Sequence, residues 1–264
     1  MGSNPAAPTS FSDTGPQSRG SGRFGAKVSS ASPETSVMEA EYRKSALRYV
    51  GLMFRKLAFW RAEPPIATVE AFSEFVETRA KFIAQVTLYG YLKTRAGTRF
   101  PELFKDEVFG QSLDIAKWQI YLMCLSDLMV YAGGLLSQRA DAGAEDLVPM
   151  TRALAEKILA RDMEQLEPLE GFADTRAAIL GRLQSTEWRD VEDGEGPFDG
   201  SQNALVKWAP VAPQLKEFDT EIVINSMRFK WKGVRDQIRS RLEAAAVIDD
   251  WRRSPESELN PAAR

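Results

Sequence analysis

The stretch 118-WQIYLMCLSDLMVYAGGLL-136 decides the fold of this 264-residue chain. Its nineteen residues include only Gln119, Ser126 and Asp127 as strongly polar members. The length approaches a membrane span, which needs about twenty apolar residues, but a carboxylate at the middle of such a span is costly. A helix that is apolar on all sides usually lies in a protein core. The stretch therefore predicts a buried central helix over about 114–138, with membrane insertion of 118–136 as the alternative.

Helical patterns flank this central stretch on both sides. In 68–96, apolar residues recur every three or four positions, and Gly97 then fits the residue that follows a helix end. A capping box of Ser36 and Glu39 opens another pattern, over 36–61, which Pro64 and Pro65 stop. Further patterns cover 146–163, 173–188 and 219–245, with a short turn of helix from Pro101 and with Asp219 as the cap of the last. Without convincing alternating strands, these patterns predict an all-α fold, an irregular helical bundle of about six helices with a disordered N-terminal arm.

Composition divides the chain into three segments. Residues 1–35 hold eight Ser with several Gly and Pro, too little apolar surface to offset the entropy of ordering, so we expect a disordered arm. Residues 36–253 are expected to form a single all-α domain with an acidic, loop-rich insertion around 190–217, and 254–264 a frayed tail. The arm lacks a continuous apolar run, which argues against a secretory signal, and organellar import is less favoured than a cytoplasmic location.

The residue types exclude much catalytic chemistry. The chain has no histidine and one cysteine, Cys124, so histidine-based triads, HExxH sites and Cys/His zinc sites cannot be built. No GxxxxGK[ST], Ser-x-x-Lys or GxSxG motif occurs. The single GxGxxG, at Gly20, Gly22 and Gly25, lies in the Ser-rich arm without a preceding strand, so we interpret it as chance. We expect no catalytic residue, metal or cofactor that these motifs would hold.

Charge is unevenly distributed along the chain. Over 141–200, fifteen acidic residues face six basic ones, while both flanking regions carry a small positive excess. A chain with a net charge of −3 is a poor candidate for general nucleic-acid binding, which depends on many phosphate contacts. The acidic segment is a candidate for pairing with basic helices inside the molecule.

The first candidate surface is a basic amphipathic helix over 38–61. Cations and aromatic side chains alternate there, as in helices that bind anionic membranes or a partner's groove. The alternative, which the periodicity favours, is a bundle helix whose cationic stems cover apolar surface. The residues that would bind are Arg43, Lys44, Arg48, Arg55, Lys56, Phe59, Trp60 and Arg61.

The second candidate is the last helical pattern, where Phe229 and Trp231 stand among basic residues. Aromatic and cationic side chains together can bind single-stranded nucleic acid, but Trp231 falls on the apolar stripe and is better interpreted as core. The heptad-like stripe from Ile224 to Ala245 also suits a homodimer seam.

The third candidate is a small-anion site near the turn after the 68–96 helix. If this helix packs antiparallel to the central one, residues close to the turn approach one another. Cations and hydroxyls beside a Gly-containing turn suit a small anion. The alternative is a surface turn with one ion pair that satisfies Asp127. The residues are Tyr91, Lys93, Arg95, Arg99 and Asp127.

Taken together, these patterns predict a non-enzymatic helical adaptor or scaffold, cytoplasmic or peripheral to a membrane. Its expected partners are a protein, an anionic lipid surface or both, reached through the basic helix. The alternative function is a small-anion-binding protein or a histidine-independent enzyme that uses the third candidate site.

Overall fold

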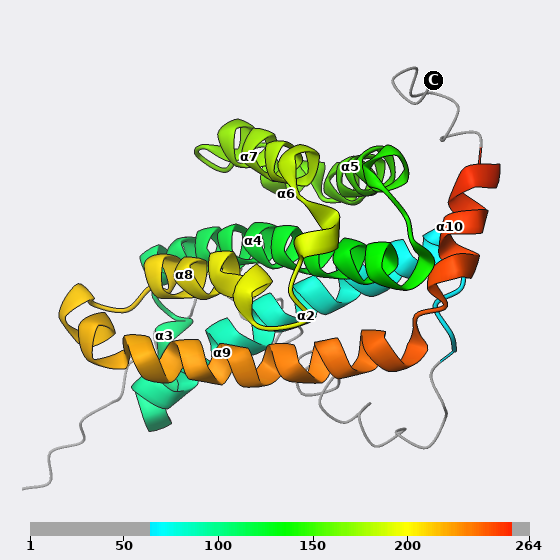
Figure 1. Ribbon diagram of the computed structural model, residues 1–264. Helices are drawn as coiled ribbons and strands as arrows, with labels where there is room; N and C mark the ends of the chain where they lie inside the picture. The colour runs from blue at the N-terminus through cyan, green and yellow to red at the C-terminus, as the bar shows by residue number, and fades with distance from the viewer. Residues whose placement is uncertain (1–63, 255–264) are drawn as a thin grey trace, which may run out of the picture. The chain divides into compact units, whose positions relative to one another are not determined.

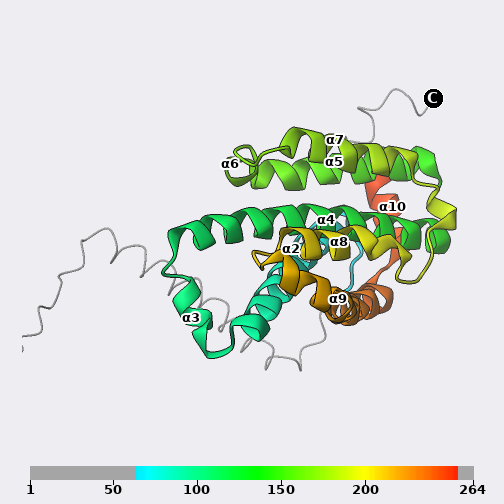
Figure 2. The ribbon, with the colours of Figure 1, turned by 90° about the vertical axis from the view of Figure 1, so that its left-hand side faces the viewer.

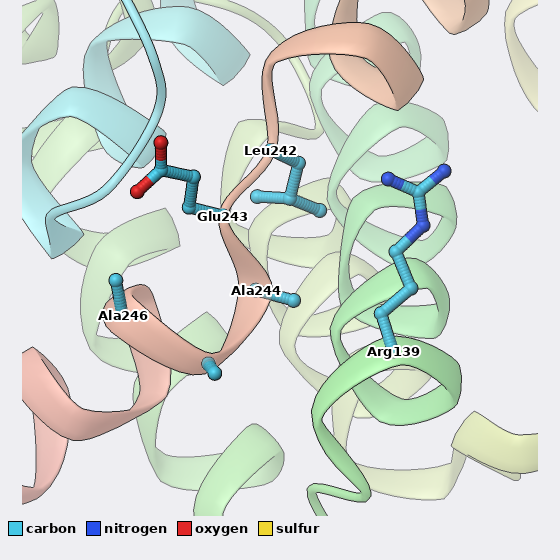
Figure 3. A pocket seen from close by; sticks show the side chains of 6 residues that line it. Arg139, Leu242, Glu243, Ala244 and Ala246 are labelled. Atoms are coloured by element: carbon cyan, nitrogen blue, oxygen red, sulfur yellow. The ribbon is translucent and has the colours of Figure 1, made fainter.

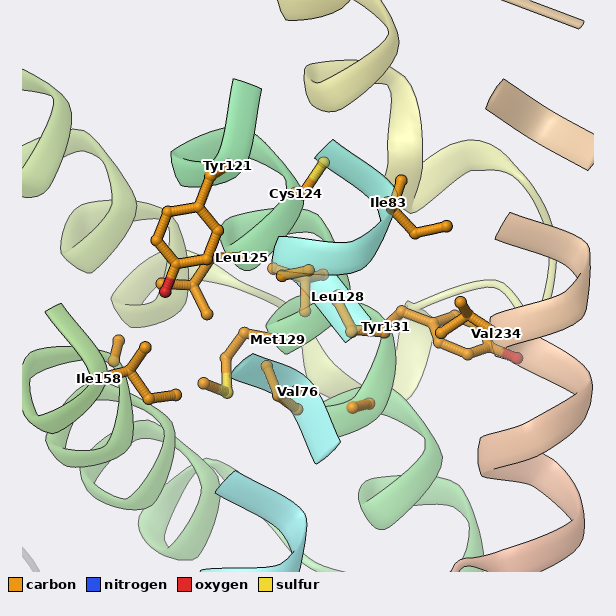
Figure 4. Packing of buried hydrophobic residues seen from close by; sticks show 14 of the residues in the cluster. Val76, Ile83, Tyr121, Cys124, Leu125, Leu128, Met129, Tyr131, Ile158 and Val234 are labelled. Atoms are coloured by element: carbon orange, nitrogen blue, oxygen red, sulfur yellow. The ribbon is translucent and has the colours of Figure 1, made fainter. Parts of the chain in front are cut away.

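Helix α4 (Glu107–Ala140) is the centre of the fold in the computed structural model, which describes residues 64–254. From Gln119 to Ser137 nearly every α4 side chain is buried, which confirms the predicted central helix. By length and composition α4 could cross a membrane, but 94% of its apolar window is buried inside the chain. Figure 4 shows Leu128 and Met129 of α4 among Val76, Ile158 and Val234 from three other helices.

Helix α2 (Val69–Ala96) packs along α4 and matches the predicted 68–96 pattern. The hydroxyl of Thr68 accepts a hydrogen bond from the backbone N–H of Ala71 (3.1 Å) and so caps the helix start. Gly97 ends it with φ of 55°, a conformation that favours glycine. The 3₁₀ turn η2 (Gly97–Arg99) and the short helix α3 (Phe100–Leu103) then lead to α4.

Helices on both sides cover the central helix. On one side lie α5 (Ala144–Arg161), the short α6 (Met163–Leu166) and α7 (Phe172–Ser185), and on the other lie α2 and α9 (Pro213–Arg241) (Figure 1; Figure 2). Helix α8 (Asp199–Trp208) lies beside α4. A helix that is apolar all round therefore finds apolar partners on every side.

The predicted loop around 190–217 is wrong over much of its length, because it contains α8 and the first turn of α9. Pro213 occupies the start of α9, where its fixed φ and missing N–H are tolerated, so this proline begins a helix rather than breaking one. Asp219, predicted as the cap of the last helix, consequently lies inside α9. The chain from Ser185 to α8 is non-helical apart from the 3₁₀ turns η3 (Trp188–Asp190) and η4 (Gly196–Phe198).

The predicted last helix over 219–245 is interrupted. After α9 ends at Arg241, Leu242 adopts extended backbone and forms a parallel bridge with Ile66, and α10 (Ala244–Arg253) follows. The N–H of Ile66 donates to the carbonyl of Arg241 (2.8 Å), and that of Glu243 donates to the carbonyl of Ile66 (3.0 Å). This pairing breaks the helix, because Arg241 and Glu243 give backbone groups to a distant segment.

Two adjacent glycines let the segment after α7 approach α4 closely. A Cβ on Gly133 would lie 2.4 Å from Cζ3 of Trp188, and one on Gly134 would lie 2.6 Å from Cβ of Val191. Both distances are shorter than any van der Waals contact, so glycine is needed at both positions. The segment is further held by Gln138, whose side-chain amide donates to the carbonyl of Val191 (2.7 Å).

An all-α fold is confirmed for the described residues, where Ile66 with Leu242 is the only β-type pairing. The predicted arm over 1–35, the predicted helix over 36–61 and the tail after Ser254 lie outside the described residues.

Candidate functional site

The basic surface predicted on 38–61 cannot be placed, since its residues lie outside the described range. These residues are Arg43, Lys44, Arg48, Arg55, Lys56, Phe59, Trp60 and Arg61. Their binding to a membrane or partner stays a prediction.

The structure does not bring together the residues predicted to form the third candidate site. Tyr91, Lys93 and Arg95 lie on the last turns of α2, and Arg99 lies in η2. Asp127 lies twenty residues beyond the start of α4, about 30 Å along the helix from the turn. Its inclusion in the site is therefore wrong: the antiparallel packing brings only the beginning of α4 close to the turn.

Arg95 and Arg99, two of the cations near this turn, pair with carboxylates of the chain. Asp219 of α9 accepts two hydrogen bonds from the Arg95 guanidinium and one from the Tyr91 hydroxyl (2.8 Å). The bonds from Arg95 hold the pKa of Asp219 below its usual range, while burial together with Asp219 raises the pKa of Tyr91 to about 12. Arg99 lies 3.7 Å from Glu102 with an exposed side chain. The hydrogen bonds from Arg95 and Tyr91 to Asp219 tie the end of α2 to the beginning of α9.

Asp127 forms a buried ion pair with a residue that the sequence analysis missed. Nη1 of Arg182, on α7, donates to Oδ1 of Asp127 (2.5 Å), and the backbone N–H of Ser201 donates to Oδ2 (2.6 Å). Burial raises the pKa of Asp127, and Arg182 and Ser201 oppose that rise. Because Ser201 lies in the first turn of α8, Asp127 supplies the N-terminal cap that α8 lacks on its own chain segment. A Cβ on Gly200 would lie 2.8 Å from Oδ1 of Asp127, so glycine permits this approach.

The second arm of Arg182 extends the same cluster. Its Nη2 donates to the carbonyl of Pro197 (2.9 Å), and Nη1 also donates to the Ser126 hydroxyl (3.1 Å). Arg182 thus connects α7, α4 and η4, the turn that precedes α8. The ion pair that the sequence analysis considered for Asp127 is present, although its cation comes from α7.

The described residues form surface depressions, two of which are considered as ligand sites. One of about 440 Å³ lies at the start of α10 (Figure 3), lined by Arg139, Leu242, Glu243 and the three alanines 244–246. The other, of about 120 Å³, is lined by Lys81, Ala84, Gln85, Lys117, Trp118 and Tyr121. The ammonium groups of the second are paired already: Lys81 with Glu77 and Asp162, and Lys117 with Asp114. No group of three or more Cys, Asp or Glu side chains within 64–254 is arranged to hold a metal ion.

The acidic loop 191–196 lies against the basic side of α9, which confirms the predicted internal pairing. Asp193 accepts a hydrogen bond from the Tyr131 hydroxyl (2.6 Å) and lies 3.4 Å from Nη1 of Arg239. Glu195 lies 3.3 Å from Nε of Arg228 and 3.7 Å from Nη2 of Arg235. The three arginines recur at spacings of seven and four, which places them on one face of α9.

The apolar stripe of α9 is covered within the chain. Met227, Trp231, Val234 and Ile238 are at most 3% exposed, and the Trp231 ring lies 4.5 Å from that of Phe198. Trp231 is therefore core, as its periodicity indicated. A homodimer through Ile224–Ala245 stays a prediction, and it would have to use another face of the helix.

A second apolar stripe, which the sequence analysis missed, runs along the outside of α9. Its members are 45–79% exposed and are spaced by three, four and seven residues, so they share one helix face: Leu215, Phe218, Ile222 and Phe229. We name this surface the α9 stripe. Spacing could have revealed it, but assignment of 190–217 to a loop and of Asp219 to a cap hid its first half.

No protein-family model, curated protein or solved structure matches this chain.

Proposed function

We propose that this chain is a non-enzymatic helical adaptor that binds a helical segment of a partner protein on the α9 stripe. The observation that carries the proposal is the exposure of Phe218 (79%), Ile222 (70%) and Phe229 (71%) on a single helix face. Single exposed apolar residues are ordinary, whereas several on one helix face are typical of interaction sites. From Leu215 to Phe229 the row is about 21 Å long, enough for four turns of a partner helix.

The charges beside the stripe indicate the kind of partner. Glu217 and Glu221 are exposed and flank Phe218 and Ile222 along the first half of the row. Carboxylates at that position repel an anionic lipid surface and attract cations. The first half of the stripe therefore suits an amphipathic helix with an apolar face and basic flanks, which would pack side chain against side chain as helices do in bundles.

A designed amphipathic peptide of Leu and Lys, long enough for four turns, tests the stripe on the full-length protein. We expect fluorescence anisotropy to show binding of this peptide, with weaker binding of a Leu/Glu analogue of equal length. The double variant Phe218→Ser/Ile222→Ser is expected to weaken binding of the Leu/Lys peptide by roughly tenfold or more, because two anchors lose apolar contact.

Val108→Ser is the matched control, since Val108 is 72% exposed on α4. Its affinity for the Leu/Lys peptide should equal that of the wild type. The proposal fails if the double variant binds the peptide as tightly as the wild type, or if both peptides bind equally well.

A second proposed surface is the basic segment 38–61, whose pattern of cations and aromatics suits an anionic membrane. We expect full-length protein to co-float with anionic vesicles at low salt and less at physiological salt, because lipid charge attracts each nearby cation by about 1 kcal/mol.

The variant Arg43→Glu/Lys44→Glu/Arg48→Glu should lose this flotation. Its control, Lys230→Glu/Lys232→Glu on α9, should retain it. Equal flotation of both variants, or of wild type with neutral vesicles, would remove the membrane proposal and with it the peripheral location.

A further inference from the structure

The cluster around Glu195 has more buried hydrogen-bond donors than acceptors. Arg235 of α9 is only 8% exposed and lies 3.7 Å from Glu195, and Gln202 of α8 is only 2% exposed and accepts a hydrogen bond from Arg228. Nε of Arg235 and Nε2 of Gln202 are buried without a hydrogen-bond partner. Buried donors in proteins are almost always paired, so two orphans in one cluster indicate a missing acceptor.

The carboxylate that faces these donors is held loosely. Glu195 lies 3.3 Å from Arg228 and 3.7 Å from Arg235, while charge-assisted hydrogen bonds measure about 2.7–2.9 Å. Its side chain is 50% exposed. Nε of Arg228 also donates to Oε1 of Gln202 (3.2 Å), which orients the amide so that its NH₂ group remains available.

The cluster extends from the protein surface into the interior. Arg228 is 41% exposed along its side chain, whereas Arg235 is covered, so the cluster has an open side and a buried floor. Two guanidinium groups against one carboxylate leave a local excess of one positive charge. Asp193, the next carboxylate along the loop, is engaged by Tyr131 and Arg239.

We propose that Arg228, Arg235 and Gln202 form a binding site for a phosphate-type oxyanion, which Glu195 occupies in the absence of ligand. A tetrahedral oxyanion offers several acceptor oxygens, enough for the orphan Nε of Arg235 and the Gln202 amide together with Arg228. Binding requires Glu195 to move into solvent, where its half-exposed side chain already extends. This inference does not depend on the α9 stripe or on the adaptor role.

Isothermal titration of full-length protein with inorganic phosphate, at constant ionic strength set with chloride, tests the site. We expect Glu195→Gln to bind phosphate roughly fivefold or more tightly than wild type, because the internal competitor loses its charge. Glu192→Gln is the matched control, as Glu192 is an exposed carboxylate of the same loop. It should leave the phosphate affinity near the wild-type value.

Arg228→Gln in the Glu195→Gln background should weaken phosphate binding roughly tenfold, and because Arg228 is partly exposed this change should not prevent folding. O-phosphoserine as a second titrant distinguishes two forms of the ligand. Tighter binding of O-phosphoserine than of phosphate indicates that the site takes an esterified phosphoryl group, and weaker binding indicates that it takes the free ion. The proposal is overturned if neither wild type nor Glu195→Gln binds phosphate, or if Glu192→Gln and Glu195→Gln gain affinity equally.

Discussion

Replacing Arg182 by methionine is expected to lower the free energy of unfolding by about 3 kcal/mol. The change leaves Asp127, which is fully buried, without the one cation that pairs with it among residues 64–254, and breaking a buried pair from one side typically costs about 3–5 kcal/mol. The lower end of this range applies because the Arg182 side chain is 36% exposed and water screens part of the interaction. Urea unfolding at neutral pH measures the difference.

The pH dependence of this variant has a defined sign. Burial raises the pKa of Asp127, and loss of Arg182 removes the main opposing charge, so the folded pKa of this carboxyl rises further above its unfolded value near 3.9. The folded state then binds a proton more tightly than the unfolded state. The stability of Arg182→Met relative to wild type is therefore greatest below the unfolded pKa and falls as pH rises through the folded pKa.

Asp127→Asn in the Arg182→Met background is the control, since it removes the unpaired charge and keeps an oxygen for the Ser201 N–H. It should recover more than half of the lost stability. An Arg182→Met protein within about 1 kcal/mol of wild type, or a double variant no more stable than the single one, would contradict this account of the ion pair.

Trp231→Ala is expected to cost about 3–5 kcal/mol of unfolding free energy, as large-to-small changes in a packed core do. Trp231 is 1% exposed, its ring contacts Phe198, and its indole N–H donates to the Ser201 hydroxyl (3.0 Å). The change opens a cavity between α8 and α9 and also leaves the Ser201 hydroxyl without its donor. A fall in the midpoint of urea unfolding at unchanged m-value would show the loss.

Phe229→Ala is the matched control on the same helix. Phe229 lies two residues before Trp231 but is 71% exposed, so its loss should change the unfolding free energy by no more than about 0.5 kcal/mol. Equal destabilisation by both variants would mean that the outer face of α9 is covered, and would also remove the α9 stripe as a binding surface.

The parts of the fold that the sequence predicts well are those governed by one local rule. The apolar character over 118–136, with Asp127 near its middle, favours a buried helix over a membrane span, and α4 is that buried helix. Spacing by three and four from Val69, followed by Gly97, fixes both the existence and the end of α2. The burial of Trp231 follows from its place on the apolar stripe of α9.

The parts that sequence reasoning missed depend on partners far away along the chain. Asp127 clearly needs a cation, but nothing local selects Arg182, which is 55 residues away and lies on another helix. Helix α8 is short and receives its cap from α4, so its own sequence lacks the usual start signal. The break at Leu242 depends on pairing with Ile66, 176 residues earlier. Spacing alone cannot report such long-range contacts.

The bridge between Ile66 and Leu242 also has a mechanical consequence. Residues 64–69 are fastened to the α9–α10 junction and to α10, through the Ile66 bonds and through a bond from the Val69 N–H to the Asp250 carboxylate (2.9 Å). A force applied to residues 1–63 would act on these hydrogen bonds before it acted on α2. The first bonds to break would therefore be those of Ile66 and Val69, and not the contacts of the core. A chain pulled by its N-terminal segment would therefore part first at the bonds between residues 64–69 and the α9–α10 junction, while α4 and its surrounding helices remained packed.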